Sequence, residues 1–162
     1  MRAAIAGLIV VALFAGCGFQ LRGSAQLPFE TLYIPGATPL SVELRRNVTA
    51  SSKTRLVDSP DKAQAVFAFT NEMREKAILS FTSAGKVNEY RLGYRIGFRV
   101  TDSKSLQVFL PTSEILLTRD MSYNDAQVIA KENEEQLLYR DMQTDMVQQI
   151  MRRLAAAHPQ VE

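Results

Sequence analysis

The sequence contains only one cysteine and one histidine, and this scarcity limits its chemistry. A single cysteine cannot form a disulfide within the chain. The histidine, His158, precedes Pro159 near the C-terminal end, where nothing would hold it as a catalytic base or a metal ligand. We therefore expect no catalytic residues, no metal site and no diffusible cofactor, and the sequence argues against an enzyme.

A strong excess of one charge is also lacking, because the formal net charge is only +2. This balance gives no indication of nucleic-acid binding. The sequence has neither an internal repeat nor a low-complexity segment. Its length is that of one domain, which can bury a core without disulfides or metals.

No hydrophobic run is long enough for a membrane-spanning helix. The apolar run Ala3–Phe14 follows Arg2 and leads into Ala15–Gly16 and then Cys17, the order of a signal peptide with its cleavage site. This segment resembles a bacterial lipobox, with Phe14 where that pattern prefers leucine. We expect removal of residues 1–16 and an N-acyl and S-diacylglycerol lipid on Cys17. An ordinary secretory signal or a buried apolar helix is the alternative.

The remaining chain divides into three parts. Residues 17–28 contain glycines and end in a proline without sustained periodicity, which indicates a lipidated tether. Residues 29–157 form a single domain, and residues 158–162 are a C-terminal tail. Acylation by two or three chains would make the membrane anchor stable. Gly18 stands where enterobacterial lipoproteins retained at the inner membrane have aspartate, so the resemblance favours the outer membrane.

Apolar and polar residues alternate in the middle of the chain, as in half-buried strands. In residues 87–100 the alternation places Tyr94 and Phe98 on a core face and the arginines on a wet face. The same reading of residues 67–81 predicts a core face made of Phe67, Phe69, Met73, Ala77, Leu79 and Phe81. The intervening residues 82–86 contain a glycine and predict a hairpin turn.

Shorter patterns complete the fold. Residues 32–34 predict a short strand, and residues 106–121 predict a further strand in which Pro111 indicates an edge or a bulge. Apolar residues at helical spacing predict helices over residues 39–52 and 125–156. The sequence thus predicts an α+β two-layer sandwich, with two helices packed on one face of a four-stranded mixed sheet.

Four short motifs are similar to those of the LptE family of lipopolysaccharide-assembly lipoproteins, and they occur in the family's order. They are C-G-F-Q-L-R-G at Cys17–Gly23, N-E-Y at Asn88–Tyr90, A-K-E-N-E-E-Q at Ala130–Gln136 and I-M-R-R-L at Ile150–Leu154. The resemblance implies a non-catalytic protein that assists assembly of the outer-membrane β-barrel LptD, plugs it, and contacts lipopolysaccharide. It also implies a domain on the periplasmic side and within the barrel.

The resemblance implies cations that meet the phosphates of lipopolysaccharide. Lys131 falls on the family motif, Lys86 lies in the hairpin turn, and Arg91 is a further candidate. The alternative for Lys131 is a pair within the helix with Glu134 or Glu135, three and four residues on. The sequence leaves the two roles of Lys131 open.

The wet face of the sheet is a candidate partner surface. It is expected to carry Arg91, Arg95 and Arg99 beside Arg74 and Lys76, and this polar surface could meet the polar lumen of a large barrel. It could equally be a solvated face. The alternative function is that of a periplasmic lipoprotein accessory, pilotin-like or a barrel-assembly factor, of a different outer-membrane machine.

Overall fold

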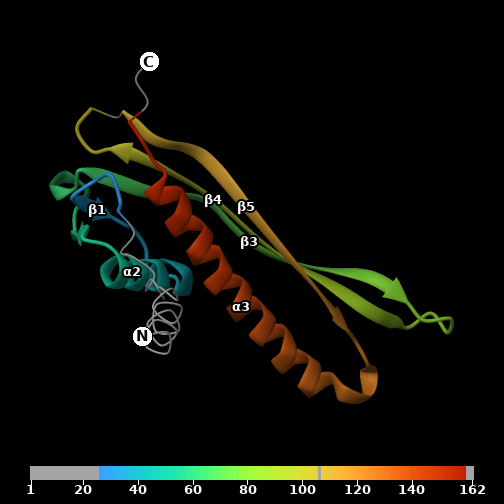
Figure 1. Ribbon diagram of the computed structural model, residues 1–162. Helices are drawn as coiled ribbons and strands as arrows, with labels where there is room; N and C mark the ends of the chain where they lie inside the picture. Colours follow the sequence, from blue (N-terminus) through green and yellow to red (C-terminus); the bar gives the residue numbers. More distant parts are fainter. Residues whose placement is uncertain (1–25, 106, 160–162) are drawn as a thin grey trace, which may run out of the picture.

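The computed structural model describes residues 26–105 and 107–159, and its long strands run beside a long helix (Figure 1). The expected signal peptide, Cys17 and most of the tether lie outside the described residues. The strands are β1 Thr31–Tyr33, β2 Arg55–Leu56, β3 Ala65–Phe81, β4 Val87–Asp102 and β5 Val108–Ser122. The helices are α2 Pro39–Ser51, α3 Val128–Ala155 and the short 3-10 helices η1 Pro60–Lys62 and η2 Asp125–Gln127.

The strands form one mixed sheet in the order β2-β1-β3-β4-β5. β1 runs parallel to β2 and β3, whereas β3, β4 and β5 are antiparallel. The predicted α+β class is confirmed, and the sheet has five strands instead of four. The sequence missed β2 because two residues are too short to show a period.

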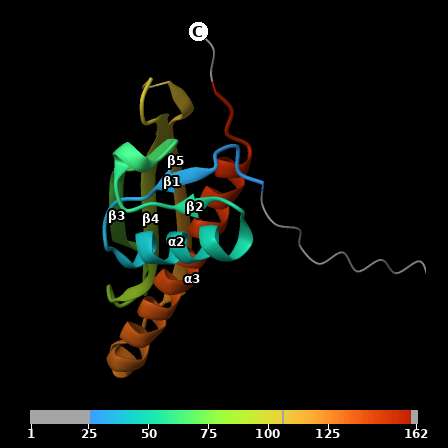
Figure 2. The ribbon, with the colours of Figure 1, turned by 90° about the vertical axis from the view of Figure 1, so that its left-hand side faces the viewer.

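The helices among the described residues cover one face of this sheet, and Figure 2 shows α2 crossing beside α3 in front of the long strands. Thr38 begins α2, since its Oγ1 accepts a hydrogen bond of 3.3 Å from the Ser41 backbone N–H. Apolar side chains at helical spacing in α2 and α3 are fully buried: Leu40, Leu44, Val48, Met142, Met146, Ile150 and Leu154. None of these helices is both long and apolar enough to cross a membrane.

The molecule has two unlike ends. α2, β1 and β2 form what we call the proximal end, where the described chain begins at Gln26 (Figure 1). The turn at residues 82–86, η2 and the first turns of α3 form the distal end. All the buried residues of α3 lie from Met142 onward, so the distal half of this helix is not enclosed by the core.

A β-bulge interrupts β3. Phe69 lies opposite Phe98, but the next paired residues are Asn71 and Gly97, which leaves Thr70 as the extra residue. A Cβ on residue 97 would clash with Thr70 Oγ1 and lie 3.4 Å from the Asn71 backbone nitrogen. Glycine at position 97 therefore makes room for the bulge.

Beyond the bulge, each side chain of β3 points to the side of the sheet opposite to the one that strict alternation predicts. Beyond it, Arg74 lies opposite the buried Tyr94 and Lys76 opposite the buried Leu92, so both basic residues face the helices. The predicted core face of β3 is wrong from this point, and Met73 belongs to the open face of the sheet. The one extra residue at the bulge changes the parity of every following side chain.

Pro111 lies in an edge strand and near a register shift, as the sequence predicted. β5 is an edge strand of the sheet. Its register with β4 shifts near the proline, because Phe98 pairs with Ser113 and Val100 with Leu110. The strand thereby accommodates a residue that has no backbone N–H to donate.

Candidate functional site

The hairpin turn and the start of the last helix meet at the distal end. Gly85 closes the turn with a φ of +76°. The Thr82 backbone N–H donates to the Lys86 carbonyl over 2.7 Å. Lys86 Nζ then lies 3.1 Å from Oδ2 of Asp125, which begins η2. The two elements that carry Lys86 and Lys131 therefore lie at the same end.

Positive φ angles occur at two glycines of the described residues, Gly85 and Gly36, the latter with a φ of +84° in the loop after β1. Both lie in the left-handed region that glycine adopts without a steric cost. The positive φ of Gly85 allows the tight turn that brings Lys86 back toward Asp125.

A small cavity of about 80 Å³ lies between the distal parts of β3, β4, β5 and α3. Its lining residues are Lys76, Tyr90, Met121, Tyr123, Val128, Lys131, Glu132 and Glu135. Tyr90 and Tyr123 pack edge to face, with ring centroids 5.1 Å apart. The cavity therefore joins two ammonium groups and two carboxylates to an aromatic wall.

Lys76 is held firmly in this cavity. Its Nζ lies 2.5 Å from Glu135 Oε2 and 4.4 Å from the centroid of the Tyr90 ring. The hydrogen bond to Glu135 is the largest cause that raises the pKa of Lys76, against a smaller lowering by burial. These contacts tie β3 to α3 and keep the lysine charged.

Lys131 forms an ion pair with Glu134 in the same helix, which was the alternative to a role in ligand binding. Its Nζ lies 2.8 Å from Glu134 Oε2, three residues on, and donates to Ser122 Oγ over 3.0 Å. Only 14% of the side chain is exposed. The pairing within the helix is thus present, and a role of Lys131 in ligand binding stays a prediction.

Large apolar side chains are exposed around these lysines. The distal part of β3 exposes Ile78, Leu79 and Phe81, the last by 61%, and the start of α3 exposes Val128 and Ile129, the last by 77%. Water-exposed apolar side chains gathered in one region indicate a contact surface. Cations beside apolar side chains suit a ligand that carries both phosphate and hydrocarbon.

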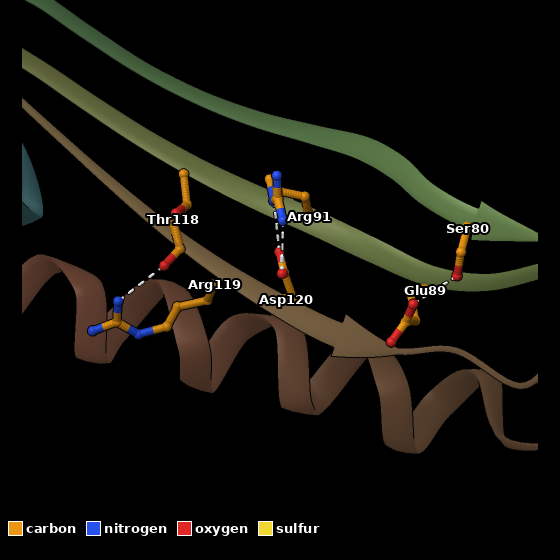
Figure 3. Close-up of polar contacts among 6 residues, drawn as sticks. All are labelled: Ser80, Glu89, Arg91, Thr118, Arg119 and Asp120. Atoms are coloured by element: carbon orange, nitrogen blue, oxygen red, sulfur yellow. Dashed lines mark hydrogen bonds and ion pairs between the residues drawn. The ribbon is translucent and has the colours of Figure 1, made fainter.

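Arg91 does not join this group. Its guanidinium binds Asp120 of β5 through two hydrogen bonds, of 2.7 and 2.9 Å, and the two residues face one another in Figure 3. The pair lowers the pKa of Asp120 and raises that of Arg91. Arg119, the neighbour of Asp120, instead reaches α3 and binds Asp145 over 2.6 Å. Arg91 lies outside the residues that line the cavity.

The open face of the sheet carries the other predicted arginines. Arg95 forms an ion pair with Glu114, and Arg99 is exposed. The expectation that Arg74 and Lys76 share this face is wrong, because the bulge at Thr70 turns both toward the helices. Whether this face meets a partner stays a prediction.

Arg74 belongs to a polar network that sequence reasoning missed. Its guanidinium lies 4.7 Å from the Tyr94 ring centroid and donates to Gln143 Oε1 over 3.4 Å. Gln143 Nε2 in turn donates to Glu43 Oε2 over 2.7 Å, which links α3 to α2. Only the bulge places Arg74 here, so the alternating pattern contained no signal for it.

The described residues show no group of three or more side chains able to hold a metal ion. His158 is exposed, near the end of the described chain. The predicted lipidation site, Cys17, lies outside the residues that the structure describes. The distal end is the candidate site because it combines Lys86, Lys131 and the exposed apolar side chains.

These features define a class of small two-layer α+β domains with a basic, partly apolar distal end. A model of the LptE family, described as lipopolysaccharide-assembly, matches residues 29–154, so the chain belongs to the LptE family. The LPS-assembly lipoprotein LptE of Yersinia enterocolitica is 26% identical over 160 residues, covering 93% of this chain and 73% of the relative.

Solved structures are similar as well. The solution structure of the uncharacterized lipoprotein B from Nitrosomonas europaea has a TM-score of 0.74 and 38% identity, covering 86% of this chain and 91% of that one. The crystal structure of the rare lipoprotein B from Shewanella oneidensis has a TM-score of 0.66 at 22% identity, covering 81% and 94%, and shows the same fold.

Proposed function

We propose that the protein is a non-catalytic outer-membrane lipoprotein, anchored through an acylated Cys17. In this proposal it assists assembly of the lipopolysaccharide-transport barrel LptD, plugs that barrel, and contacts lipopolysaccharide on its way to the outer leaflet. Membership of the LptE family supports the proposal, as do relatives named LPS-assembly lipoproteins.

The observation that supports ligand contact is that Lys86 and Lys131 lie at the same end of the domain as a group of exposed apolar side chains. The ammonium groups supply positive charge for phosphates. Side chains such as Phe81 and Ile129 supply apolar surface for the hydrocarbon beside them. The polar, cation-bearing surface and the apolar surface thus occur side by side, as an amphiphile requires.

The open face of the sheet supports contact with a barrel. No helix among the described residues covers it, and it presents Arg91, Arg95 and Arg99 together with exposed Met73 and Leu116. A mixed surface of this kind fits the polar interior of a large barrel. A pilotin-like or barrel-assembly role in a different machine is the alternative, and family membership does not favour it.

Charge reversal at both lysines tests ligand contact. Lys131→Glu combined with Lys86→Glu should weaken binding to purified lipopolysaccharide at least tenfold, because carboxylates would then face phosphates. The loss should diminish as salt rises. The matched control is Lys53→Glu with Lys62→Glu, an equal charge change on exposed lysines away from the distal end.

Affinity and thermal midpoint are measured on the same preparations. A purely structural role for the two lysines predicts a small change in thermal midpoint and unchanged affinity. That outcome, with a folded domain, would remove both residues from the site and leave partner binding as the function to test.

A further inference from the structure

The pairing of β3 with β4 is irregular beside the hairpin turn, at the segment Asn88–Tyr90. Ser80 pairs with Glu89 there, and the register shifts on both sides of this pair. As a result Leu79 on β3 and Asn88 on β4 have no pairing partner in the β3–β4 ladder. Each strand thus has one residue left over at the distal end, where other contacts have to hold the strands together.

A polar cluster joins the two strands at this irregularity. Ser80 Oγ donates a hydrogen bond of 2.6 Å to Glu89 Oε2, and Figure 3 shows this contact between the strands. Asn88 Nδ2 donates to the same Ser80 Oγ over 3.3 Å. The Ser80 hydroxyl therefore acts as donor and acceptor at once, which fixes its orientation. Side chains thus hold β3 to β4 where the ladder leaves Leu79 and Asn88 out.

The same segment of β4 holds the chain that leads into the last helix. Tyr123 follows β5 and directly precedes Asn124, the N-cap of η2. Its backbone N–H donates to the Asn88 carbonyl over 2.8 Å. Its ring packs edge to face on Tyr90, and both rings are half-buried. The start of η2 is therefore fixed on β4 by a backbone hydrogen bond and a ring contact.

The Lys86–Asp125 ion pair alone would not hold the hairpin turn against η2. The two side chains are 68% and 56% exposed, and exposed pairs of this kind contribute little. The contacts of Asn88 join the same two elements through its side chain and its carbonyl. Asn88 therefore has a larger part than the ion pair in setting how the hairpin lies against η2.

We propose that Asn88 is a positioning residue of the distal site. Its side chain fixes the hairpin that carries Lys86, and its carbonyl fixes the segment that leads to Lys131. The two ammonium groups are thereby set in their relative places before a ligand arrives, which lowers the ordering cost of binding. This inference rests on the proposed function, because it concerns the same site.

Asn88→Ala in the full-length chain is the test, since it removes the side-chain contact with Ser80 and leaves the backbone carbonyl. The affinity for purified lipopolysaccharide should fall roughly 5-fold, the effect of about one net hydrogen bond. The amide hydrogen of Tyr123 should also exchange faster with solvent, because the hairpin opens more often. Unchanged affinity in a folded variant would overturn the proposal.

A double-mutant cycle with Lys86→Gln shows whether Asn88 acts through the lysine. Positioning predicts that Lys86→Gln weakens binding in the wild type and has a much smaller effect once Asn88→Ala is present. Losses that simply add would overturn the positioning role. Ser80→Ala should reproduce the loss from the other partner of the bond, whereas Ser80→Thr, which keeps the hydroxyl, should bind like the wild type.

The matched control is Asn47→Ala in α2. The amide of Asn47 donates to the Glu43 carbonyl over 3.1 Å and accepts from Gln148 Nε2 over 3.1 Å, away from the distal end. Its loss should lower the thermal midpoint and leave the lipopolysaccharide affinity unchanged. An equal loss of affinity in this control would mean that general destabilisation acts, and would overturn the proposal. If Asn88→Ala does not fold, Ser80→Ala and Ser80→Thr carry the test.

The outcomes separate this inference from the function on which it rests. If the lysine reversals weaken binding and both Asn88→Ala and Ser80→Ala leave it unchanged, the positioning role is wrong and ligand contact stands. If the wild type does not bind lipopolysaccharide, the proposed ligand contact fails, and the positioning role fails with it.

Discussion

Tyr94 shows how one residue of β4 connects the core to the polar network above it. The ring is fully buried, its hydroxyl donates to Glu72 Oε1 over 2.8 Å, and Arg74 lies over its face. Burial is the largest cause that raises the pKa of Tyr94, to about 12. The fold therefore keeps the Tyr94 hydroxyl protonated at alkaline pH values at which an exposed tyrosine would ionise.

The raised pKa predicts a loss of stability in alkali. Its stabilising contribution is fully present below the unfolded pKa of 10.0 and is lost as pH rises toward about 12, because only the unfolded chain ionises readily in that range. Tyr94→Phe should lower stability by about 1 kcal/mol at pH 8, through loss of the hydrogen bond. The difference from wild type should shrink between pH 10 and 12. Urea unfolding across this range measures it, and parallel profiles would contradict the assignment.

Lys131 marks the limit of sequence reasoning for single residues. The spacing of Lys131 from Glu134 and Glu135 indicated an ion pair within the helix as one of two roles, and the pair with Glu134 is present. The contact of Lys86 with Asp125 joins residues 39 positions apart and depends on how the hairpin packs on η2. Spacing along one helix can be read from sequence, whereas packing between elements cannot.

At the scale of elements, β4 and β3 differ in how well the sequence predicted them. β4 keeps a strict alternation, and its core residues Leu92, Tyr94, Ile96, Phe98 and Val100 are all fully buried as expected. β3 contains the bulge at Thr70, which composition does not reveal, so its distal half was assigned to the wrong faces. The bulge thus gives Arg74 and Lys76 surroundings that differ from those predicted from the sequence.

Neighbouring residues of β4 test the assignment of faces. Phe98 is buried and stacks on Phe67 with ring centroids 5.4 Å apart, while Arg99 is exposed. Phe98→Ala should cost about 3 to 5 kcal/mol of unfolding free energy, and Arg99→Ala less than about 0.5 kcal/mol. Chemical denaturation of both variants measures the difference. Similar losses would show that the faces are misassigned.

Gly97 tests the bulge. Gly97→Ala should cost about 1 to 3 kcal/mol, because the new methyl group meets Thr70 Oγ1 and the Asn71 backbone. Gly93→Ala is the matched control, since its methyl group would lie an ordinary 3.6 Å from Glu75 Cβ. Adding Thr70→Ala to Gly97→Ala should recover part of the loss. Equal effects of the two glycine substitutions in thermal unfolding would argue against the bulge.

At the scale of the whole molecule, the enclosed core and the candidate site lie at different ends. The proximal end holds α2, and the start of α3 lies at the other end of the long helix (Figure 1). This distal end carries Lys86, Lys131 and the exposed apolar side chains. The sequence predicted the fold class and the family because both depend on patterns spread over the chain. It left the arrangement of the site open because that depends on packing.

The predicted lipid anchor, Cys17, lies outside the described residues, and a substitution there tests it. Cys17→Ala should leave an unprocessed precursor without acyl chains, because the thiol that carries the lipid is gone. Mass spectrometry of the membrane fraction measures both cleavage and acylation. Mature wild-type protein with an unmodified Cys17 would contradict the anchor.

The proposed partnership with a lipopolysaccharide-transport barrel can be tested by purification from outer membranes. Full-length protein with a C-terminal affinity tag is solubilised in mild detergent, and the bound proteins are identified and quantified by mass spectrometry. We expect one LptD-type β-barrel per chain, and loss of that barrel's folded form when the chain is depleted. Recovery of the lipoprotein without a barrel, or with a secretin ring, would contradict it.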